Sequence, residues 1–282
     1  CDVQQLRSIV ERACDLQRLI SMDAVRDLAG DVSLLPAVPR SYFEISRVLA
    51  DPRSSASDVA RIIEQDPAPS AKVLQVVNSA FFGLPRSVTS VVEAAGFLGT
   101  LTLRNLALAM EAASPNQKGQ KLPPRQLKAF QANSLLVALI GRRWFSGRPQ
   151  KADEVFAAGM LRELGSLLLA TRGEATRDDV APSALSAYLL GLWGIPHAIM
   201  EAVAFYDTPN RIEHEGIETV DVLHLADRIA GEMAPSPFRQ SAPLDVSYFE
   251  ARGVDAAKIE SFRDEARELA KETLRMLAAA AR

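Results

Sequence analysis

The sequence predicts an all-α protein with two helical lobes. Apolar residues recur at intervals of three and four along most of the 282 residues, while convincing strand signals are few. Capping residues, prolines and glycines mark helix starts and stops at short intervals. A polar segment rich in helix breakers, residues 114–124, is the best candidate for a boundary inside the chain. We therefore expect helices on both sides of this segment, with one lobe on each side.

The chain opens on an amphipathic helical pattern. Asp2 followed by Gln5 resembles a capping box, and apolar residues then recur at helical spacing as far as Ile20. A lone helix of this kind must pack on another domain, on a second copy of the chain, or on the body of the protein. The sequence leaves these three alternatives open. A second, short helix is expected over residues 23–29, and it stops at Gly30.

Residues 35–113 predict a series of short helices. Ser90 followed by Glu93 forms a capping box, and Asp66 is the expected N-cap of a helix that has Pro67 at its first position. Five helices are expected here. The first ends at Leu49, the second runs from Ser55 or Ser57 to Gln65, and the third runs from Pro67 to a break at 83–85. The fourth runs from Ser90 to Gly99, and the fifth covers 101–113.

The second half of the chain predicts longer helices. Two helices are expected over 125–145 and 155–170, and two more lie on either side of a turn at 194–196. Another starts at Thr219 or Asp221, and the last runs from 255 to the end. Asn133 lies on an apolar stripe, so its amide needs internal hydrogen-bond partners. Trp144 and Trp193 are expected in the core. His197 is expected at the surface or as a cap, and His214, in an acidic loop-like stretch, is expected to be solvated.

The helix expected over 155–170 is the most informative element. At about 100° per residue, Arg162, Glu163 and Ser166 fall in one arc, which also contains Gly159. The remaining faces are apolar, so the helix is expected to be buried nearly all round. The groups that meet Arg162 and Glu163 must then be polar and internal. They form an active site, a former active site, or an ion pair in a core.

The composition excludes several classes of protein. A formal net charge of −3 with mixed signs gives no electrostatic footprint for nucleic acid. No apolar run approaches the ~18 residues that cross a membrane, and we expect no signal peptide. Two cysteines, Cys1 and Cys14, are too few for a disulfide framework and indicate a reducing compartment, so we expect a cytoplasmic protein. The first residue is not Met, which suggests a segment of a longer protein.

Several motifs resemble the HDOD family. They are L-P-A-V-P at 35–39, D-V-A-R-I-I-E-Q-D-P at 58–67, N-S-A-F-F-G-L at 78–84, V-T-S-V-V-E-A-A-G-F-L-G at 88–99, Y-L-L-G-L-W-G-I-P at 188–196 and H-L-A-D-R-I-A at 224–230. The resemblance implies an all-α bacterial signalling module related to the HD metal-dependent phosphohydrolases. It implies a linker helix at 1–33, an HDOD domain at 34–232 and a C-terminal extension with an amphipathic helix at 233–282. Within the HDOD domain it implies a small lobe at 34–113 and a degenerate HD-like lobe at 125–232.

The resemblance also locates a vestigial metal site. The matching positions in this chain are Asn133, Arg162, Glu163, Asp207, His224 and Asp227. The metal-binding His-Asp dyad of catalytic HD proteins aligns with Arg162-Glu163, and an arginine cannot ligate a cation because it offers only donors. His224 and Asp227 alone remain as a matching His and Asp. We therefore expect no metal, no cofactor and no catalytic residue.

Two interpretations of Arg162 follow. Its guanidinium could neutralise Glu163, Asp227 or Asp207 and hold a polar network together in the core. It could instead bind a phosphate-bearing ligand through bidentate hydrogen bonds.

The expected function is a non-catalytic output domain that works by protein–protein contact. The first residues resemble the last helix of a response-regulator receiver, so the resemblance implies an upstream receiver domain in the parent chain. The partner is an unknown signalling protein, a homodimer is possible, and neither nucleic acid nor a membrane is expected. Two alternatives stay open: a residual metal-dependent phosphohydrolase, and a sensor that binds a nucleotide second messenger between the lobes.

Overall fold

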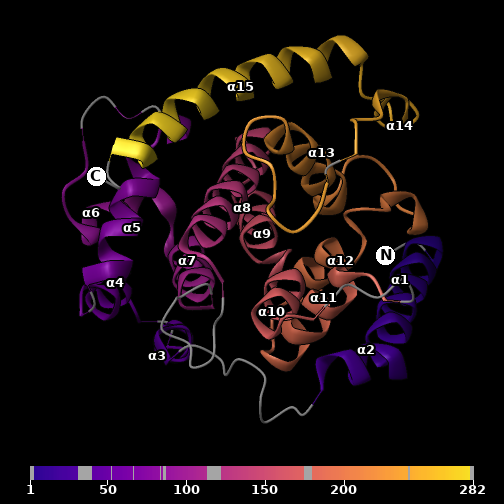
Figure 1. Cartoon of the computed structure of the whole chain (residues 1–282), viewed down its shortest axis with the longest axis horizontal. Coiled ribbons are helices and arrows are strands. Elements are labelled where there is room, and N and C mark those ends of the chain that lie inside the picture. The colour runs from indigo at the N-terminus through magenta and orange to yellow at the C-terminus, as the bar shows by residue number, and fades with distance from the viewer. Residues whose placement is uncertain are drawn as a thin grey trace. The chain divides into compact units, whose positions relative to one another are not determined.

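The computed structural model describes residues 3–30, 40–51, 53–65, 67–82, 84, 87–112, 122–174, 180–240 and 242–279. Every regular element in these residues is a helix (Figure 1). The prediction of an all-α fold is therefore confirmed. The chain divides into two compact units, the first made of Cys1–Leu35 and Pro115–Asp264, the second of Pro36–Ser114 and Glu265–Arg282. The boundaries of the linker, domain and extension stay a prediction.

Unit 2 is built from short helices that follow the sequence signals closely. They are α3 (Arg40–Leu49), α4 (Ala56–Glu64), α5 (Pro67–Val77), a 3₁₀ turn (Ala80–Phe82), α6 (Val91–Leu98) and α7 (Thr100–Ala112), together with the part of α15 (Ala256–Ala279) from Glu265 onward. Of the two candidate caps for α4, the structure uses Ser55, whose backbone N–H donates to the carboxylate of Asp58 at 2.9 Å. The hydroxyl of Ser90 accepts from the backbone N–H of Glu93 at 3.1 Å. The predicted N-cap Asp66 lies outside the described residues.

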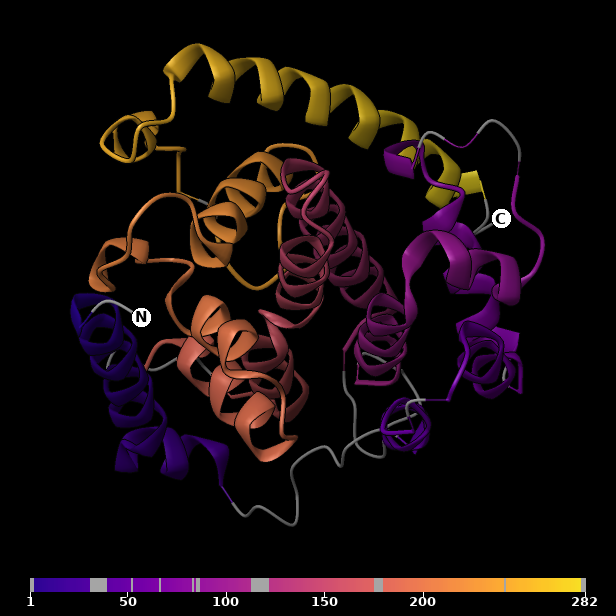
Figure 2. The ribbon, with the colours of Figure 1, turned by 180° about the vertical axis from the view of Figure 1, so that it is seen from behind.

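Unit 1 contains the remaining helices. They are α1 (Val3–Ser21), α2 (Asp23–Ala29), α8 (Pro124–Trp144), α9 (Pro149–Leu161), α10 (Leu164–Arg172), α11 (Pro182–Leu192), α12 (His197–Phe205), a 3₁₀ turn (Pro209–Arg211), α13 (Thr219–Gly231), α14 (Val246–Glu250) and the first part of α15 (Ala256–Ala279). Helices α8 and α9 lie side by side, and α13 packs against both (Figure 2). Trp193 is buried as predicted, while Trp144 is half-buried and packs edge-on against Phe262, with ring centroids 4.9 Å apart.

A glycine sets the close approach of α8 and α9. A Cβ atom on Gly159 would lie 2.7 Å from both the backbone nitrogen and the Cα atom of Ala138. Contacts this short do not occur for real side chains, so any larger residue would force the two helices apart. This close packing brings Arg162, which directly follows α9, within hydrogen-bond distance of Asn133 on α8.

The single helix predicted over 155–170 is wrong, because the structure has a turn between α9 and α10 at Arg162 and Glu163. The backbone N–H of Gly165 donates to the hydroxyl of Ser186 on α11 at 2.8 Å. A Cβ atom on Gly165 would lie 2.3 Å from the carbonyl oxygen of Pro182. The start of α10 is thus held against α11 by a tertiary contact, which a helical periodicity cannot reveal.

Helix α1 packs on the body of the protein, which was one of the three alternatives. Arg12 makes a bidentate pair with Glu201 of α12, with its Nε atom 2.9 Å from Oε1, and Leu16 is 2% exposed. Two of the apolar residues that recur at helical spacing along this helix, Ile9 and Val10, instead stay 55% and 52% exposed. The proposed capping residue Asp2 lies outside the described residues. The receiver-tail interpretation of this helix stays a prediction.

None of the helices, as far as the structure describes them, combines the length and apolar character needed to cross a bilayer.

Candidate functional site

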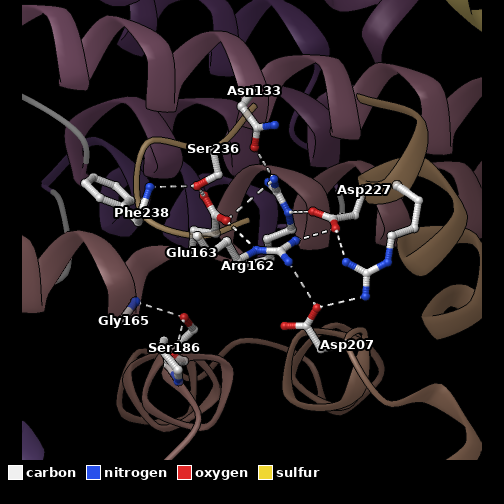
Figure 3. A network of polar contacts seen from close by, with 12 residues as sticks. Asn133, Arg162, Glu163, Gly165, Ser186, Asp207, Asp227, Ser236 and Phe238 are labelled. Atoms are coloured by element: carbon white, nitrogen blue, oxygen red, sulfur yellow. Dashed lines mark hydrogen bonds and ion pairs between the residues drawn. The ribbon is translucent and has the colours of Figure 1, made fainter. Parts of the chain in front are cut away.

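The candidate site is a buried cluster of charged side chains in unit 1 (Figure 3). It gathers residues from α8, the α9–α10 turn, the end of α12, α13 and the segment that follows α13. Its members are Asn133, Arg162, Glu163, Asp207, Asp227, Arg228, Ser236 and Arg239. The innermost charged residues, Arg162, Glu163 and Asp227, are 0%, 1% and 2% exposed. Charges buried to this extent are costly unless they are paired and hydrogen-bonded.

Arg162 lies at the centre of the cluster. Its Nε atom donates to Oδ1 of Asp227 at 2.9 Å, and its Nη1 atom donates to the carbonyl oxygen of Gly159 at 2.8 Å. Its Nη2 atom donates to Oδ1 of Asn133, as Figure 3 shows. The amide nitrogen of Asn133 then donates to the carbonyl oxygen of Ala234 at 2.6 Å. Each guanidinium nitrogen therefore has an acceptor, and the inward amide predicted at Asn133 has its partners.

The two innermost carboxylates are also fully engaged. Oε1 of Glu163 accepts from Nε of Arg239 at 2.8 Å, and Oε2 accepts from the hydroxyl of Ser236 at 2.8 Å. Oδ2 of Asp227 accepts from Nη1 of Arg228 at 3.2 Å and from Nη2 of Arg239. Oδ1 of Asp227 accepts from Arg162, so every oxygen of these two carboxylates accepts at least one hydrogen bond.

Asp207 forms the outer edge of the cluster. Its Oδ1 atom accepts from Nη2 of Arg228 and from Nη1 of Arg239, both at 3.2 Å. The side chain of Asp207 is 37% exposed, compared with 6% for Arg228 and 20% for Arg239. The cluster therefore runs from a fully buried centre to an edge that reaches solvent.

The charges of the cluster balance. Three arginines face three carboxylates: Arg162, Arg228 and Arg239 against Glu163, Asp207 and Asp227. Burial by itself would raise the pKa of Asp227, but the charges of Arg162 and Arg239 outweigh it and hold the pKa below its usual value. Asp227 is thus ionised at neutral pH, and the arginines supply the positive charge that its carboxylate requires.

A divalent cation does not fit this arrangement. In the residues that the structure describes, no three side chains of His, Cys, Asp or Glu are placed to hold a metal ion. The carboxylates are separated by guanidinium groups, which offer donors only and repel a cation. The positive charge at the centre of the cluster is supplied by the arginine side chains.

His224 does not join the cluster, although it lies on α13 with Asp227. Its Nδ1 atom is 2.7 Å from the carbonyl oxygen of Tyr206, and its ring packs near those of Tyr248 and Phe249. Burial lowers the pKa of His224, so the neutral imidazole is favoured and its Nδ1–H donates to Tyr206. The structure therefore brings five of the six predicted site residues together in the cluster, and it places the sixth, His224, next to the cluster.

Three members of the cluster were not among the predicted site residues. Arg228 follows Asp227 directly in the H-L-A-D-R-I-A motif, so its position in the sequence could have suggested a role. Ser236 and Arg239 come from the segment after α13, which the prediction assigned to a C-terminal extension. No periodicity marks these two residues, and only the folded chain brings Arg239 back to Glu163.

The prediction of a solvated His214 is wrong. Its side chain is 1% exposed, and its Nε2 atom is 2.7 Å from Oδ2 of Asp221 in the first turn of α13. The hydroxyl of Tyr248 donates to the other oxygen of the same carboxylate. Burial would raise the pKa of Asp221, but the hydrogen bonds from His214 and Tyr248 lower it below its usual value. The acidic stretch around His214 thus folds back onto α13, because it carries a partner for a buried carboxylate.

Fold and cluster together define an all-helical domain whose polar core is filled by arginine–carboxylate pairs. The model of the HDOD domain matches residues 35–182, just over half of the chain. The chain therefore belongs to the HDOD family.

Several solved structures have a similar fold. One is a HDOD domain protein with unknown function from Geobacter sulfurreducens, with a TM-score of 0.64, 20% identity, and coverage of 88% of this chain and 96% of that one. Another, from Shewanella amazonensis SB2B, is named "Putative phosphohydrolase"; it has a TM-score of 0.62 and 20% identity and covers 92% of this chain and 99% of that one. At these identities the likeness concerns the fold alone.

A curated relative is an uncharacterized protein of Treponema pallidum (strain Nichols), 24% identical over 221 residues. The match covers 71% of this chain but 42% of the length of that relative.

Proposed function

We propose that this chain is a non-catalytic signal-transduction domain that acts by protein–protein contact. The observation that carries the proposal is the arginine-filled cluster. By resemblance to catalytic HD proteins, Arg162-Glu163 stands at the position of the metal-binding dyad, and here Arg162 is bonded to Asp227 at 2.9 Å. A metal in that dyad would activate water for attack on a phosphoester. A buried guanidinium supplies charge without activating water.

The two innermost carboxylates of the cluster do not offer an alternative catalytic base. Glu163 and Asp227 are buried, and each of their oxygens already accepts a hydrogen bond. A general base must reach the proton it abstracts within hydrogen-bond distance. Neither carboxylate can do so without breaking its pair with an arginine. The geometry therefore supports a structural role for the cluster, with function at the surface.

The surface of unit 2 offers apolar side chains for a partner. The exposed large apolar residues there are Phe43 (66%), Phe97 (46%), Leu101 (43%) and Val92 (41%). Exposed apolar side chains of this size favour a protein-binding role when they are grouped. Phe43 on α3 is the most exposed of the four, and we propose that it contributes to partner contact.

Helix α1 is the proposed input element. Its pair between Arg12 and Glu201 fixes it to α12, while Ile9 and Val10 face away from the body of unit 1. We propose that an upstream receiver domain of the parent protein acts through this helix.

The replacement Phe43→Asp is expected to abolish capture of the partner. The wild-type chain, immobilised and exposed to an extract of its source organism, should retain a defined protein, and a charge at an apolar contact should release it. The matched control is Leu192→Asp on α11, where an apolar side chain is 47% exposed in unit 1. This control should retain the same protein as the wild type.

Equal retention by both variants would contradict the assigned surface. Metal-dependent turnover of a phosphodiester would replace the proposal with a residual phosphohydrolase. Saturable binding of a cyclic dinucleotide, measured by calorimetry, would replace it with a second-messenger sensor.

A further inference from the structure

A cavity of about 480 Å³ opens beside the outer edge of the arginine–carboxylate cluster, within unit 1. Its polar lining includes Ser166, Tyr206, Asp207, Arg228 and Arg239. Apolar side chains, among them those of Val180 and Phe238, form the rest of its wall. A volume of this size is typical of sites for small organic molecules, which occupy roughly 300–1,000 Å³. The cavity therefore joins a charged edge to a space larger than a simple ion needs.

The charged edge of the cavity has two cations and one shared anion. Arg228 and Arg239 both donate to the same oxygen of Asp207, each at 3.2 Å, which is the long end of the range for a hydrogen bond to a carboxylate. Asp207 is also the most exposed carboxylate of the cluster, at 37%. Its pairs with the two arginines are both long and partly exposed to solvent, which makes them the easiest contacts of the cluster to exchange.

Several donors around the cavity have no protein acceptor. The Nε atom of Arg228 is buried and finds no acceptor in the described part of the chain. The hydroxyls of Tyr206 and Ser166 likewise make no hydrogen bond with any described residue, and both residues line the cavity. Burial and the charge of Asp207 raise the pKa of Tyr206, so its hydroxyl keeps its proton and can donate. The site thus has more donors than acceptors, which is the requirement for binding an anion with several oxygens.

We propose that this cavity binds a small phosphorylated metabolite through its phosphoryl group. Arg228 and Arg239 hold the phosphoryl oxygens, the hydroxyls of Tyr206 and Ser166 complete the set of donors, and the apolar wall receives the organic part. Asp207 acts as the displaceable counter-ion: its carboxylate moves into solvent when the phosphoryl group takes its place. This exchange preserves the pairing of the two arginines, while Arg162, Glu163 and Asp227 keep their own partners.

The exchange predicts opposite effects for two substitutions. Asp207→Asn removes the competing charge and should tighten phosphate binding by about three- to tenfold. Arg228→Gln removes a guanidinium that contacts the anion and should weaken binding at least about tenfold. Arg211→Gln is the matched control, because Arg211 stacks on the ring of Phe205 and is absent from the lining of the cavity. It should leave the affinity unchanged.

The test is isothermal titration of the full chain with inorganic phosphate, with adenosine 5′-monophosphate as a larger phosphomonoester and acetate as a carboxylate, all at constant ionic strength. Saturable phosphate binding that tightens in Asp207→Asn supports the proposal, and tighter binding of the larger phosphomonoester supports the role of the apolar wall. Equal affinity for acetate and phosphate would overturn the phosphoryl assignment. Unchanged affinity for phosphate in Asp207→Asn would overturn the role of Asp207 as a displaceable counter-ion. Because the side chain of Asp207 is partly exposed, this variant remains informative even if Arg228→Gln fails to fold.

Discussion

Replacement of Arg162 by methionine is expected to lower the free energy of unfolding by about 3–5 kcal/mol, the cost of removing one partner from a buried ion pair. Methionine fills a similar volume but leaves Oδ1 of Asp227 and Oδ1 of Asn133 without their donor in the core. The cluster would then carry one uncompensated negative charge. Urea denaturation followed by circular dichroism measures the change.

The matched control for this prediction is Arg7→Met. Arg7 pairs with Glu11 on the solvent face of α1, where its side chain is 79% exposed. Exposed pairs of this kind contribute little to stability, so the control should unfold at the same urea concentration as the wild type. A loss in Arg162→Met no larger than in the control would mean that the buried cluster does not depend on its central cation.

Replacement of Gly159 by alanine is expected to destabilise unit 1 by about 1–3 kcal/mol, the usual cost of overfilling a packed core. The added methyl group would lie 2.7 Å from backbone atoms of Ala138, which cannot move aside as a flexible side chain could. Helices α8 and α9 would have to separate, and Asn133 would move away from Arg162. Thermal denaturation measures the loss.

Gly96 provides the matched control for this substitution. It lies in α6, and a Cβ atom there would meet nothing within 4 Å. Alanine favours a helix over glycine by about 0.8–1.0 kcal/mol, so Gly96→Ala should stabilise the protein slightly. If Gly159→Ala also stabilised the protein, the close packing of α8 on α9 would be disproved.

The fold could be predicted from the sequence because the signals for it are local. Helical periodicity and caps such as Ser90 are encoded within a few residues, and the structure follows them. The turn at Arg162 and Glu163 could not be predicted in this way. It depends on Ser186, which captures the N–H of Gly165 from a different helix.

Five of the eight members of the candidate site could be predicted from the sequence. The polar arc of Arg162 and Glu163, together with the inward Asn133, indicated that polar partners lie inside. The resemblance to the HD superfamily added Asp207 and Asp227. Arg239 was missed because its segment has no periodicity and no motif, and its contact with Glu163 joins residues that are distant in sequence. Contacts of this kind become visible only in the folded chain.

Arginine side chains supply the positive charge of this polar core, and we propose that no metal is bound there. Elemental analysis of the purified wild-type chain, after incubation with Mn²⁺ and Mg²⁺ and removal of the free ions, tests this proposal. We expect a metal content far below one ion per chain, unchanged in Asp227→Asn. One tightly held ion per chain, lost in Asp227→Asn, would show that the core binds a metal and would favour a metal-dependent phosphohydrolase.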